Sequence, residues 1–569
     1  MSDSPDEKSP TPTGGQGKGG ASVFGIGLLP AALLVAVVLV LGAILGVLAY
    51  RTYLDRKDEP SPALAADAPQ PGAGVPEKWR PDPGGRYPAQ FAATQMFPPR
   101  FDPARRDYVV RCVPGKVKVQ VRARPGTRVE VEGYPAKTGR FFAEARVLPG
   151  QDFSVRVTGR GEADNYRVRC LPDDFPRWSY RQFRRPPKGS FLVSMRPKPT
   201  NENRNWMIVF DQDGVPVWWY SPLTNTLGGQ VLADGTVQTA RGFGDGFGQD
   251  ARAINEIRTL DGRLVKTVGT KGTPTDGHEY IRLPNGNALV MSYSPRLGAD
   301  LSVLPIEGRV DRDKDASLDG EIQEVTPSGK VVWRWNSSDH IPLSEIPPRW
   351  RGRIARNPHP DPQGNRRYDT FHLNSIEPWR NQLVISTRHT DKVYGISRKT
   401  GEVLWTFGGT RTPKSLKIKG DDPHADYPIG GQHDARITDG NILSVHDNGT
   451  HLGRPPRVVR YRLDLENRTA TFVSEVTDEK AAPDSHCCGG SRPFGDGWLV
   501  AWGNNPVVSG FDSRDELAFR LTLPVPPYRA VPVPDSVSLK ALGRGLEKME
   551  MGPQPPATGV KPIEFYGTG

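Results

Sequence analysis

Short stretches of alternating apolar and polar residues fill the region between about residues 97 and 172. Segments such as "KVKVQVRA", "RVEVEG" and "DFSVRV" repeat with a period of two, as strands do when one face is buried and the other meets water. Turn-forming residues separate these segments. The pattern therefore predicts a small β-sandwich over residues 97–172.

A longer pattern recurs between residues 178 and 524. One half of each unit is a strand, a turn and an apolar run, as in "LPNGNALVMS" and "ITDGNILSVH". The other half is a strand, a tight turn and a second strand that often ends in tryptophan, as in "SRKTGEVLWTF". Six such units follow one another at intervals of about 48 to 72 residues, and a four-stranded unit at this period predicts a propeller. The expected fold class is therefore all-β, with a six-bladed β-propeller behind the sandwich.

An uncharged apolar stretch at residues 22–50 precedes these patterns. It is long enough to cross the hydrocarbon core of a bilayer, which takes about 20 apolar residues, so a single transmembrane helix is predicted. Residues 1–21, rich in Ser, Pro and Gly, are expected to be a disordered cytoplasmic tail. Residues 51–96 read as a Pro/Ala-rich linker, and residues 525–569 as a Pro-rich C-terminal tail.

The lysines and arginines beside this stretch slightly favour a cytoplasmic location for the residues that follow it. Large domains, however, cross membranes largely regardless of such counts. The cysteines favour export. Cys112 ends "DYVVRC" and Cys170 ends "NYRVRC", two similar segments that bracket the predicted sandwich. A disulfide between them would stabilise the fold by roughly 4 kcal/mol and suits an oxidising compartment; the alternative is two buried thiols. The expected location is the cell membrane, with the sandwich and propeller on the extracytoplasmic side.

The segment "FDPARRDYVVRC" resembles the opening of cadherin-like β-sandwich domains.

The net charge of +11 is spread along the chain and attracts small anions and anionic surfaces in general. The sequence has no basic stripe with interleaved aromatic residues and no nucleic-acid-binding motif, so no nucleic-acid partner is expected. It leaves the oligomeric state open.

Three histidines occupy the same position in successive units. His278 begins "HEYIRLPNGNALVMS", His372 begins "HLNSIEPWRNQLVIST" and His433 begins "HDARITDGNILSVHD". This position is the start of the predicted innermost strand, and in a propeller these starts surround one mouth of the central channel. Three blades are therefore expected to direct imidazoles into one cavity. The alternative for each histidine is a hydrogen-bonded residue at a strand end.

Arg388, in "ISTRHTD", follows on the next strand of the fourth unit. A planar guanidinium beside imidazoles can hold a tetrahedral oxyanion through its two parallel N–H groups.

The sixth unit carries adjacent cysteines, Cys487 and Cys488, for which a strained vicinal disulfide or two thiols near the channel are the alternatives. A long insert in the third unit, "RLGADLSVLPIEGRVDRDKDASLDG", is either a lid over the channel mouth or a surface loop.

The motifs "DTFHLNSIEPW", "STRHTDKVYGISRKTGEVLWTFGG" and "GGQHDARITDGNILSVHDNG", in this order, resemble the arylsulfate sulfotransferase family. The resemblance implies an exported six-bladed propeller that moves a sulfuryl group from an aryl sulfate donor to a phenolic acceptor, without a nucleotide sulfate and without a cofactor. His433 resembles the histidine that is transiently sulfated. His372 and Arg388 match the histidine and arginine that hold the sulfuryl group, and His278 corresponds to a further active-site histidine in a less similar setting.

The chemistry suits these residue types. A neutral imidazole is a competent nucleophile near neutral pH, so His433 can attack sulfur and form a sulfohistidine in a ping-pong mechanism. Arg388 would supply fixed positive charge, and His372 or His278 would protonate the leaving oxygen and later deprotonate the acceptor. No metal is required.

Three further residues are expected to support this site. Asp434 or Asp447 would fix the tautomer of His433, and Asn374 lies two residues after His372.

Three other functions compete with sulfuryl transfer. The three histidines suit zinc, although the arginine among them disfavours a second cation. A non-catalytic ligand-binding or scaffolding propeller would use the same polar channel. The motif "TGEVLWTF" resembles the tryptophan-docking repeats of quinone-cofactor propellers. The preferred reading is a membrane-anchored, nucleotide-independent aryl sulfotransferase.

Overall fold

The computed structural model describes residues 88–549, apart from residues 94, 99–100, 113–114, 160–161, 196–204, 223–225, 243–251 and 439. The predicted cytoplasmic tail (1–21), the predicted transmembrane helix (22–50), most of the predicted linker and the last part of the predicted C-terminal tail lie outside these residues. None of the helices in the described part of the chain is long and apolar enough to cross a membrane.

Two sheets around one core form the N-terminal region. One sheet has the order β1-β3-β5 and the other the order β2-β7-β6-β4. Their bounds are β1 Ala89–Ala93, β2 Asp107–Arg111, β3 Lys116–Ala123, β4 Thr127–Val131, β5 Gly139–Arg146, β6 Asp152–Gly159 and β7 Glu162–Leu171. Inward-facing side chains of both sheets, among them Tyr108, Val119, Val155 and Val168, share one buried cluster.

Strand β1 extends this sandwich into residues that the sequence assigned to the linker. Its inward positions are Ala89, Phe91 and Ala93, all buried. Two of the three are alanines, which give a weak apolar signal, and this explains why the alternation was missed.

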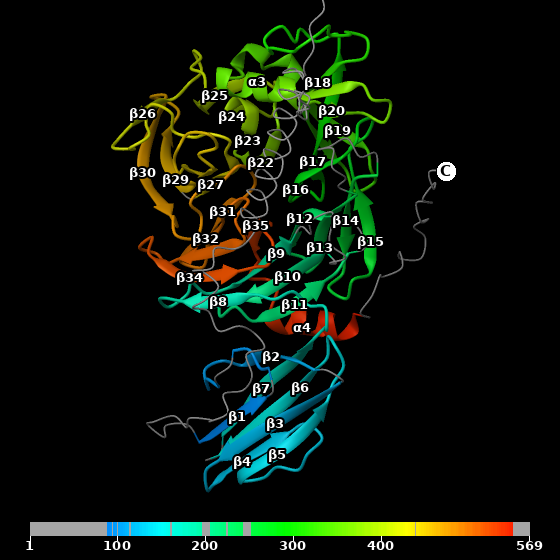
Figure 1. Ribbon diagram of the computed structural model, residues 1–569, viewed down its shortest axis with the longest axis vertical. Helices are drawn as coiled ribbons and strands as arrows, with labels where there is room; N and C mark the ends of the chain where they lie inside the picture. Colours follow the sequence, from blue (N-terminus) through cyan, green and yellow to red (C-terminus); the bar gives the residue numbers. More distant parts are fainter. Residues whose placement is uncertain are drawn as a thin grey trace, which may run out of the picture. The chain divides into compact units, whose positions relative to one another are not determined.

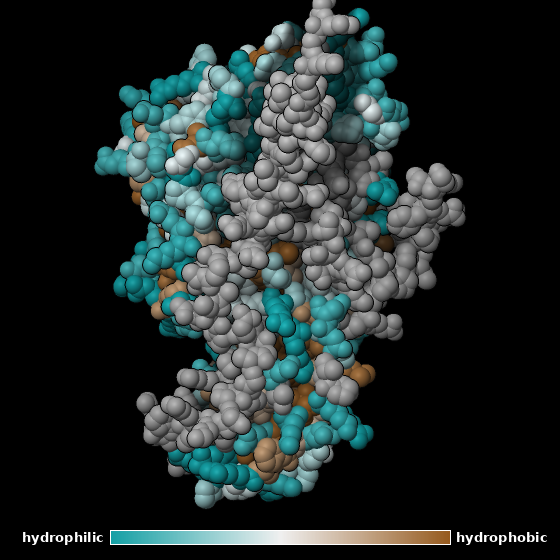
Figure 2. All heavy atoms as spheres, in the orientation of Figure 1, coloured by the Kyte–Doolittle hydropathy of each residue, from teal (hydrophilic) through white to brown (hydrophobic). Residues whose placement is uncertain are grey.

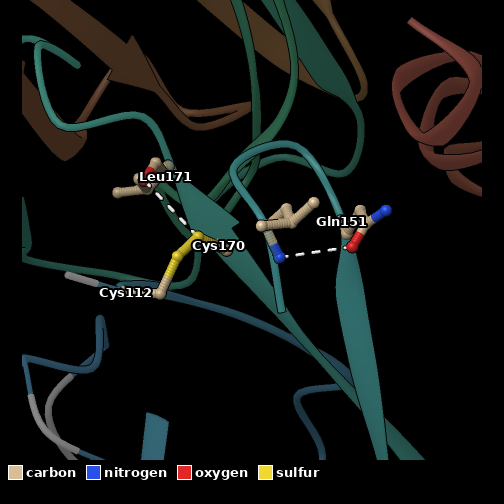
Figure 3. The surroundings of a disulfide bond; sticks show 5 residues. Cys112, Gln151, Cys170 and Leu171 are labelled. Atoms are coloured by element: carbon tan, nitrogen blue, oxygen red, sulfur yellow. Dashed lines mark hydrogen bonds between the residues drawn. A yellow bond between two sulfur atoms is a disulfide. The ribbon is translucent and has the colours of Figure 1, made fainter. Parts of the chain in front are cut away.

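The predicted disulfide is present between Cys112 and Cys170, whose Cα atoms lie 5.6 Å apart. Strands β2 and β7 pair in parallel, with Val110 opposite Cys170, so the two cysteines meet at the same end of the pair. The Cys170 amide donates to the Gln151 carbonyl at 2.9 Å (Figure 3), which ties this end of β7 to the turn before β6.

Within the described residues, six further sheets follow, each built on four strands (Figure 1). The first three contain β9 Ser190–Met195, β10 Trp206–Asp211 and β11 Pro216–Tyr220; β12 Thr226–Val231, β13 Val237–Arg241, β14 Ile254–Arg258 and β15 Leu264–Val268; and β16 Asp276–Arg282, β17 Ala288–Leu297, β18 Ala316–Val325 and β19 Val331–Asn336, with β20 His359–Pro360 and β21 Arg366–Asp369 added to the third.

The next three sheets contain β22 Leu373–Trp379, β23 Gln382–Thr387, β24 Lys392–Ser397 and β25 Val403–Gly408; β27 His433–Thr438, β28 Ile442–Asp447, β29 Arg457–Asp464 and β30 Thr469–Thr477, with β26 Lys417–Lys419 added; and β31 Gly490–Phe494, β32 Gly497–Ala501, β33 Val507–Phe511 and β34 Leu517–Thr522, with β8 Ser179–Gln182 added. Consecutive strands pair antiparallel through tight turns, and Gly286, at φ +84°, shows why such a turn needs glycine.

The six sheets close into a ring. Strand β35, Pro527–Pro532, pairs with β9 and completes the first sheet. Each edge strand of the series β35, β12, β16, β22, β27 and β31 contacts the next, and β31 contacts β35 again. This circular contact pattern is that of a propeller, with these six strands innermost.

The closing strand corrects the predicted end of the propeller. The sequence predicted a boundary at residue 524 and a Pro-rich tail beyond it, and prolines stand at both ends of "PYRAVP". Proline is tolerated at a strand end and on an edge, so β35 forms despite them. Beyond it, α4, Leu539–Lys548, is capped by the Ser538 side chain.

A helical insert separates β19 from β21. It contains the 3-10 turns η1, Ser337–Asp339, and η2, Leu343–Glu345, followed by α3, Pro348–Arg356. A third 3-10 turn, η3, Arg388–Thr390, follows β23. On the visible face, the described surface is largely hydrophilic with scattered hydrophobic residues (Figure 2). This is expected when most apolar side chains pack between the sheets.

Candidate active site

The three histidines that share a position in the repeat meet at one cavity. His278 lies on β16, His372 directly precedes β22 and His433 begins β27, so all three come from innermost strands. The ring centroids of His278 and His372 are 5.2 Å apart, and those of His372 and His433 are 6.0 Å apart. The repeat therefore brings residues about 60 to 155 positions apart into one cluster.

A local irregularity accompanies each of these histidines. The pairing of the first strand with the second shifts register between Asp276 and Tyr280, between Leu373 and Ser375, and between His433 and Arg436. Bulges of this kind redirect side chains at functional sites. His372 also adopts a left-handed backbone, at φ +53°.

The cavity has a volume of about 270 Å³ and contains two arginines and five histidines in its lining. The four residues predicted to be catalytic, His278, His372, Arg388 and His433, all line it. The remaining lining residues are Leu227, Arg353, Ile354, Asn357, His359, Asp369, His389, Cys487, Cys488 and Tyr528. Among these described residues Asp369 is the one carboxylate, so the cavity suits an anion.

Two of the three imidazoles are backed by a carboxylate. His278 Nδ1 lies 2.6 Å from Asp276 Oδ1, and His372 Nδ1 lies 2.5 Å from Asp369 Oδ2. Each carboxylate fixes the Nδ1–H tautomer and stabilises the imidazolium whenever Nε2 takes a proton. Burial and then the electrostatic effects of His278 and Arg388 hold the pKa of His372 well below its usual value.

His433 has different partners. Its Nδ1–H donates to the Gly431 carbonyl at 3.2 Å, with the Asn448 amide nitrogen 3.1 Å away, and its Nε2 accepts from the Cys488 N–H at 3.3 Å. This arrangement places the lone pair on Nε2. Burial, followed by the electrostatic effect of His372 and Arg388, lowers the pKa of His433 well below its usual value, so the ring is neutral at neutral pH.

Asp434 does not contact His433. Its carboxylate accepts from Arg436 at 2.6 and 2.9 Å, from Arg492 at 2.8 and 2.9 Å, and lies 3.5 Å from Arg529. Burial raises the pKa of Asp434, but these three arginines together hold it far below its usual value. The expectation that Asp434 sets the His433 tautomer was therefore wrong, because the left-handed residue Asp434, at φ +53°, joins a buried ion-pair cluster instead.

Asp447 and Asn374 act on the backbone that precedes His433. Asp447 Oδ1 accepts from the Gly430 N–H at 2.8 Å, and the Asn374 amide donates to the Gln432 carbonyl at 2.9 Å. Asp447 therefore does not set the tautomer directly either. Both residues position the segment from which the His433 side chain extends.

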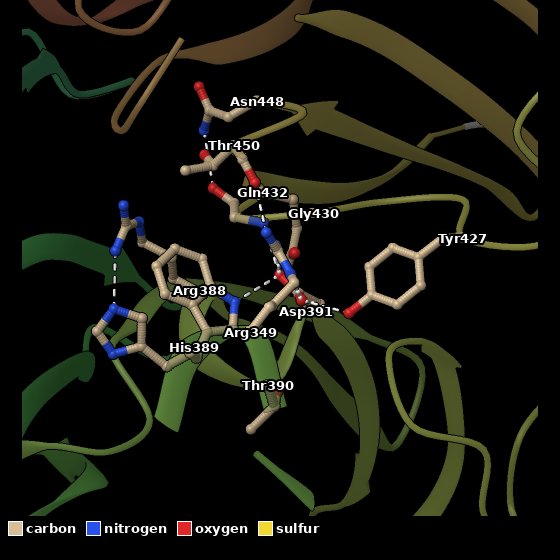
Figure 4. A network of polar contacts seen from close by, with 12 residues as sticks. Arg349, Arg388, His389, Thr390, Asp391, Tyr427, Gly430, Gln432, Asn448 and Thr450 are labelled. Atoms are coloured by element: carbon tan, nitrogen blue, oxygen red, sulfur yellow. Dashed lines mark hydrogen bonds and ion pairs between the residues drawn. The ribbon is translucent and has the colours of Figure 1, made fainter. Parts of the chain in front are cut away.

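Asp391 is the centre of a network that holds the same segment (Figure 4). Its carboxylate accepts from Arg349 at 2.5 and 2.6 Å, from Trp350 at 3.0 Å, from the Tyr427 hydroxyl at 2.6 Å and from the Gly431 N–H at 2.7 Å. The network connects α3 to the residue whose carbonyl orients His433. This network could not be predicted from the sequence, because its members lie far apart in the chain.

Arg388 is held in place on three sides. It donates to His389 Nε2 at 2.7 Å (Figure 4) and to the His486 carbonyl at 2.6 Å, and its guanidinium lies 4.5 Å from the centre of the Trp350 ring. Its buried Nε finds no hydrogen-bond partner among the described residues. A positioned cation at the cavity thus retains one donor for a ligand.

Tyr528 and Arg529 were missed because they lie in the presumed tail. Tyr528 lines the cavity, and its buried hydroxyl finds no partner among the described residues. Arg529 donates to the carbonyls of His278 at 3.0 Å and Asn374 at 2.6 Å, so the closing strand joins the third and fourth sheets. The short apolar segment "PYRAVP" was the one available signal.

Of the two alternatives for the long insert of the third unit, the cavity lining favours the surface loop over the lid. The insert at residues 296–320 contributes no residue to the cavity lining, whereas α3 and the segment after it contribute Arg353, Ile354, Asn357 and His359. The helical insert between β19 and β21 therefore lines the site, and the insert at residues 296–320 does not.

A metal ion would find suitable donors here. One nitrogen from each of His278, His372 and His433 lies within 4.8 Å of the others, and Asp369, His372 and His389 form a second such group. The carboxylates behind two of these imidazoles match the second shell that zinc sites use. Arg388 in the same cavity opposes a further cation.

Fold and site together define a class: a closed propeller of six sheets with a basic, histidine-lined cavity at the ends of its innermost strands. The arylsulfotransferase (ASST) family model matches residues 227–523, more than half of the 569 residues. The chain belongs to the arylsulfotransferase family and is an enzyme of that class. No curated protein sequence matches the chain significantly.

Solved structures give distant matches. Proteins assigned as 6-phosphogluconolactonases from Bacteroides fragilis and Bacteroides uniformis are 12% and 13% identical, each with a TM-score of 0.35, covering 61% of this chain and 98% and 99% of their own. The β-propeller domain of Cps50 (Swd1) from Myceliophteria thermophila is 10% identical, with a TM-score of 0.29, covering 60% of this chain and 87% of its own. At these TM-scores the matches carry no information about activity.

Proposed function

We propose that this six-bladed propeller is a nucleotide-independent aryl sulfotransferase that works through a sulfohistidine at His433. The observation that carries the proposal is the pairing of a neutral imidazole, with its lone pair on Nε2, and a fixed guanidinium in one basic cavity. Family membership supports the substrate class, an aryl sulfate donor and a phenolic acceptor.

In the first half-reaction, His433 Nε2 attacks the sulfur atom of the aryl sulfate. The S–N bond forms as the S–O bond to the aryl group breaks, and the electron pair of that bond leaves on the phenolate oxygen. Arg388 Nε and the Tyr528 hydroxyl, both buried donors without a hydrogen-bond partner among the described residues, suit the sulfuryl oxygens.

The carboxylate-backed imidazoles handle the proton. His278 or His372 gives a proton to the departing phenolate and takes one from the incoming phenol in the second half-reaction. Asp276 and Asp369 stabilise the imidazolium state. A bound sulfate anion also opposes the positive neighbours of His372, which favours its protonated form.

Isotope exchange tests this scheme. A ping-pong enzyme exchanges a labelled phenol into its own aryl sulfate without any second acceptor, and its double-reciprocal plots are parallel. We expect both results for the parent protein and for His424→Ala, which removes an imidazole outside the cavity, and neither for His433→Ala. The absence of exchange across a broad donor panel would leave a ligand-binding propeller.

A metal-dependent reaction is the second candidate, favoured by the three clustered imidazoles with carboxylates behind two of them. Elemental analysis and chelation separate the two. Sulfuryl transfer through His433 predicts activity that survives a strong chelator and does not depend on metal content. Activity that is lost on chelation and restored by zinc would favour the metal.

For the location, we propose a single-pass membrane protein with the sandwich and propeller outside the cytoplasm. The apolar stretch at residues 22–50 and the Cys112–Cys170 disulfide support this. Protease added to intact cells should digest the propeller if it faces outward. Protection until the membrane is permeabilised would contradict the proposal.

A further inference from the structure

Cys487 and Cys488 lie beside the nucleophile and the cation that the proposed reaction uses. Both thiols line the cavity beside His433. The peptide between them carries the Cys488 N–H, which contacts His433 Nε2 at 3.3 Å. The neighbouring His486 carbonyl holds Arg388 at 2.6 Å. The conformation of this short segment therefore bears on both the nucleophile and its cation.

The segment is held tightly in one conformation. Cys488 adopts a left-handed backbone, at φ +67°, and the Gly489 that follows lies at φ +85°. The Cys488 carbonyl accepts from Asn448 at 3.1 Å, and the Gly489 N–H donates to the Tyr528 carbonyl at 3.0 Å. A side chain on Gly489 would meet His446 Nε2 at 2.4 Å, so this position has no space for a larger residue.

Joining the two sulfur atoms requires this conformation to change. Cα atoms of adjacent residues are about 3.8 Å apart, whereas disulfides span about 4.4 to 6.8 Å between Cα atoms. A disulfide between neighbours therefore distorts the peptide that connects them. Here that peptide carries the N–H that contacts the attacking nitrogen of His433.

We infer that Cys487 and Cys488 form a redox modification site that takes small disulfides, and that closing it switches off sulfuryl transfer. The second part rests on the function proposed above. In the open form, the Cys488 N–H lies where a sulfuryl group on Nε2 would arrive and can donate to one of its oxygens. Closure turns this donor away and loosens the hold of His486 on Arg388.

The chemistry balances as two thiol–disulfide exchanges. One cysteine thiolate attacks a small disulfide, forms a mixed disulfide and releases one thiol. The second cysteine attacks the bonded sulfur of the first and releases the other thiol. The pair loses two electrons and two protons, and the reagent gains them as two thiols. Arg388 interacts electrostatically with both cysteines.

The site differs from the Cys112–Cys170 bridge, which has a Cα separation of 5.6 Å and so lies within the ordinary range. Strained disulfides are the more easily reduced ones, so a closed Cys487–Cys488 pair is expected to reopen with a mild thiol that leaves the other bridge intact.

The test uses the full-length protein in detergent, treated with bis(2-hydroxyethyl) disulfide and then with a thiol reductant. Mass spectrometry follows the peptide that contains both cysteines, and the sulfuryl transfer rate is measured before and after each step. We expect the peptide to lose two hydrogen atoms and the rate to fall about a hundredfold, as when one oxyanion donor is removed. Both changes should reverse with the reductant.

The double variant Cys487→Ser/Cys488→Ser is the control. Its ratio of treated to untreated rate should stay near one, whatever its starting rate. Carbethoxylation of His433 by diethyl pyrocarbonate gives a readout that needs no turnover, and closure should accelerate it because Nε2 no longer accepts the Cys488 N–H.

These readouts separate the two proposals. A reduced protein that never transfers a sulfuryl group refutes the proposed function, and the peptide mass and His433 carbethoxylation then decide the cysteine proposal alone. A pair that forms only mixed disulfides, or a closed pair with unchanged transfer and unchanged carbethoxylation, would overturn the redox site.

Discussion

The innermost strands β22 and β27 present two buried imidazoles that look equivalent in the sequence and differ in the structure. His372 and His433 are neighbours, and burial lowers the pKa of both. His372 donates to the Asp369 carboxylate at 2.5 Å, whereas His433 donates to the Gly431 carbonyl at 3.2 Å. A carboxylate stabilises an imidazolium and suits proton transfer, but a carbonyl fixes the tautomer and leaves the ring a neutral nucleophile. The partner behind each ring therefore divides the roles.

Removing each ring tests this division most severely. His433→Ala should lower kcat/KM by at least about ten-thousandfold, because the covalent route disappears with the nucleophile. His372→Ala should cost about a hundredfold, the usual contribution of one general acid or base. Steady-state kinetics on both variants, with His424→Ala as the control, checks the ranking. Equal losses would show that the two imidazoles do not have separate roles.

Arg388, which lines the same cavity as the two rings, is expected to have the next largest effect on the rate. Arg388→Met should lower kcat by about a hundredfold to a thousandfold, because it removes fixed charge from the transition state. Arg388→Lys keeps the charge but loses the planar fork held by His389 and His486, so it should recover only part of the rate. Full activity in Arg388→Lys would mean that only the charge matters.

Exchanging the carboxylates should reveal which ring transfers the proton. Asp369→Asn keeps the shape of the side chain but no longer stabilises the His372 imidazolium, and we expect a loss of about tenfold to a hundredfold. The loss should be largest for donors with poor leaving groups, since these need protonation most. Asp276→Asn is the matched variant behind His278. In one of the two variants the rate should depend more steeply on the pKa of the leaving group. The histidine behind which that carboxylate lies is then the general acid.

Much of this comparison could be predicted from the sequence. The repeat placed His278, His372 and His433 in register, and because each blade supplies an equivalent strand to the channel, register in sequence became proximity in space. Arg388 followed from the same argument. All four residues line one cavity.

The sequence did not predict the partners behind the rings. Asp276 and Asp369 stand two and three residues before their histidines, a local signal that was available but not used. The carbonyl partner of His433 could not be predicted, because it depends on a bulge and on the long-range contact of Asp391 with the Gly431 N–H. Tyr528 entered the site only through ring closure, which the flanking prolines concealed.

The pH dependence should sharpen the contrast further. The pKa of His433 lies well below its usual value, so the nucleophile stays neutral as the pH falls from 7 to 6 and the rate should not drop there on its account. Asn448→Asp places a carboxylate beside Nδ1, which raises the pKa of His433 and should move the acid limb of kcat/KM upward. An acid limb near the ordinary histidine value in the parent would contradict a buried neutral nucleophile.

The smallest effect concerns a buried imidazole with no proposed part in the reaction. His446 pairs with His433 across strands β27 and β28, and burial lowers its pKa to about 4. As the pH falls, His446 takes up a proton more readily in the unfolded chain than in the folded protein. The free energy of unfolding is therefore unaffected by His446 above about pH 6.5 and is about 2 kcal/mol lower at pH 5. Denaturant unfolding at pH 7 and pH 5 should show a smaller decrease in His446→Leu. An identical decrease would assign the pH dependence to other groups.

The most direct test of the account is the covalent intermediate itself. The protein is mixed with an aryl sulfate in the absence of any acceptor, quenched at alkaline pH and digested for peptide mass spectrometry. The account predicts one sulfuryl group on His433, formed together with one equivalent of phenol and lost when a phenolic acceptor is added. Phenol release without an adduct, or an adduct on His278 or His372 in place of His433, would contradict it.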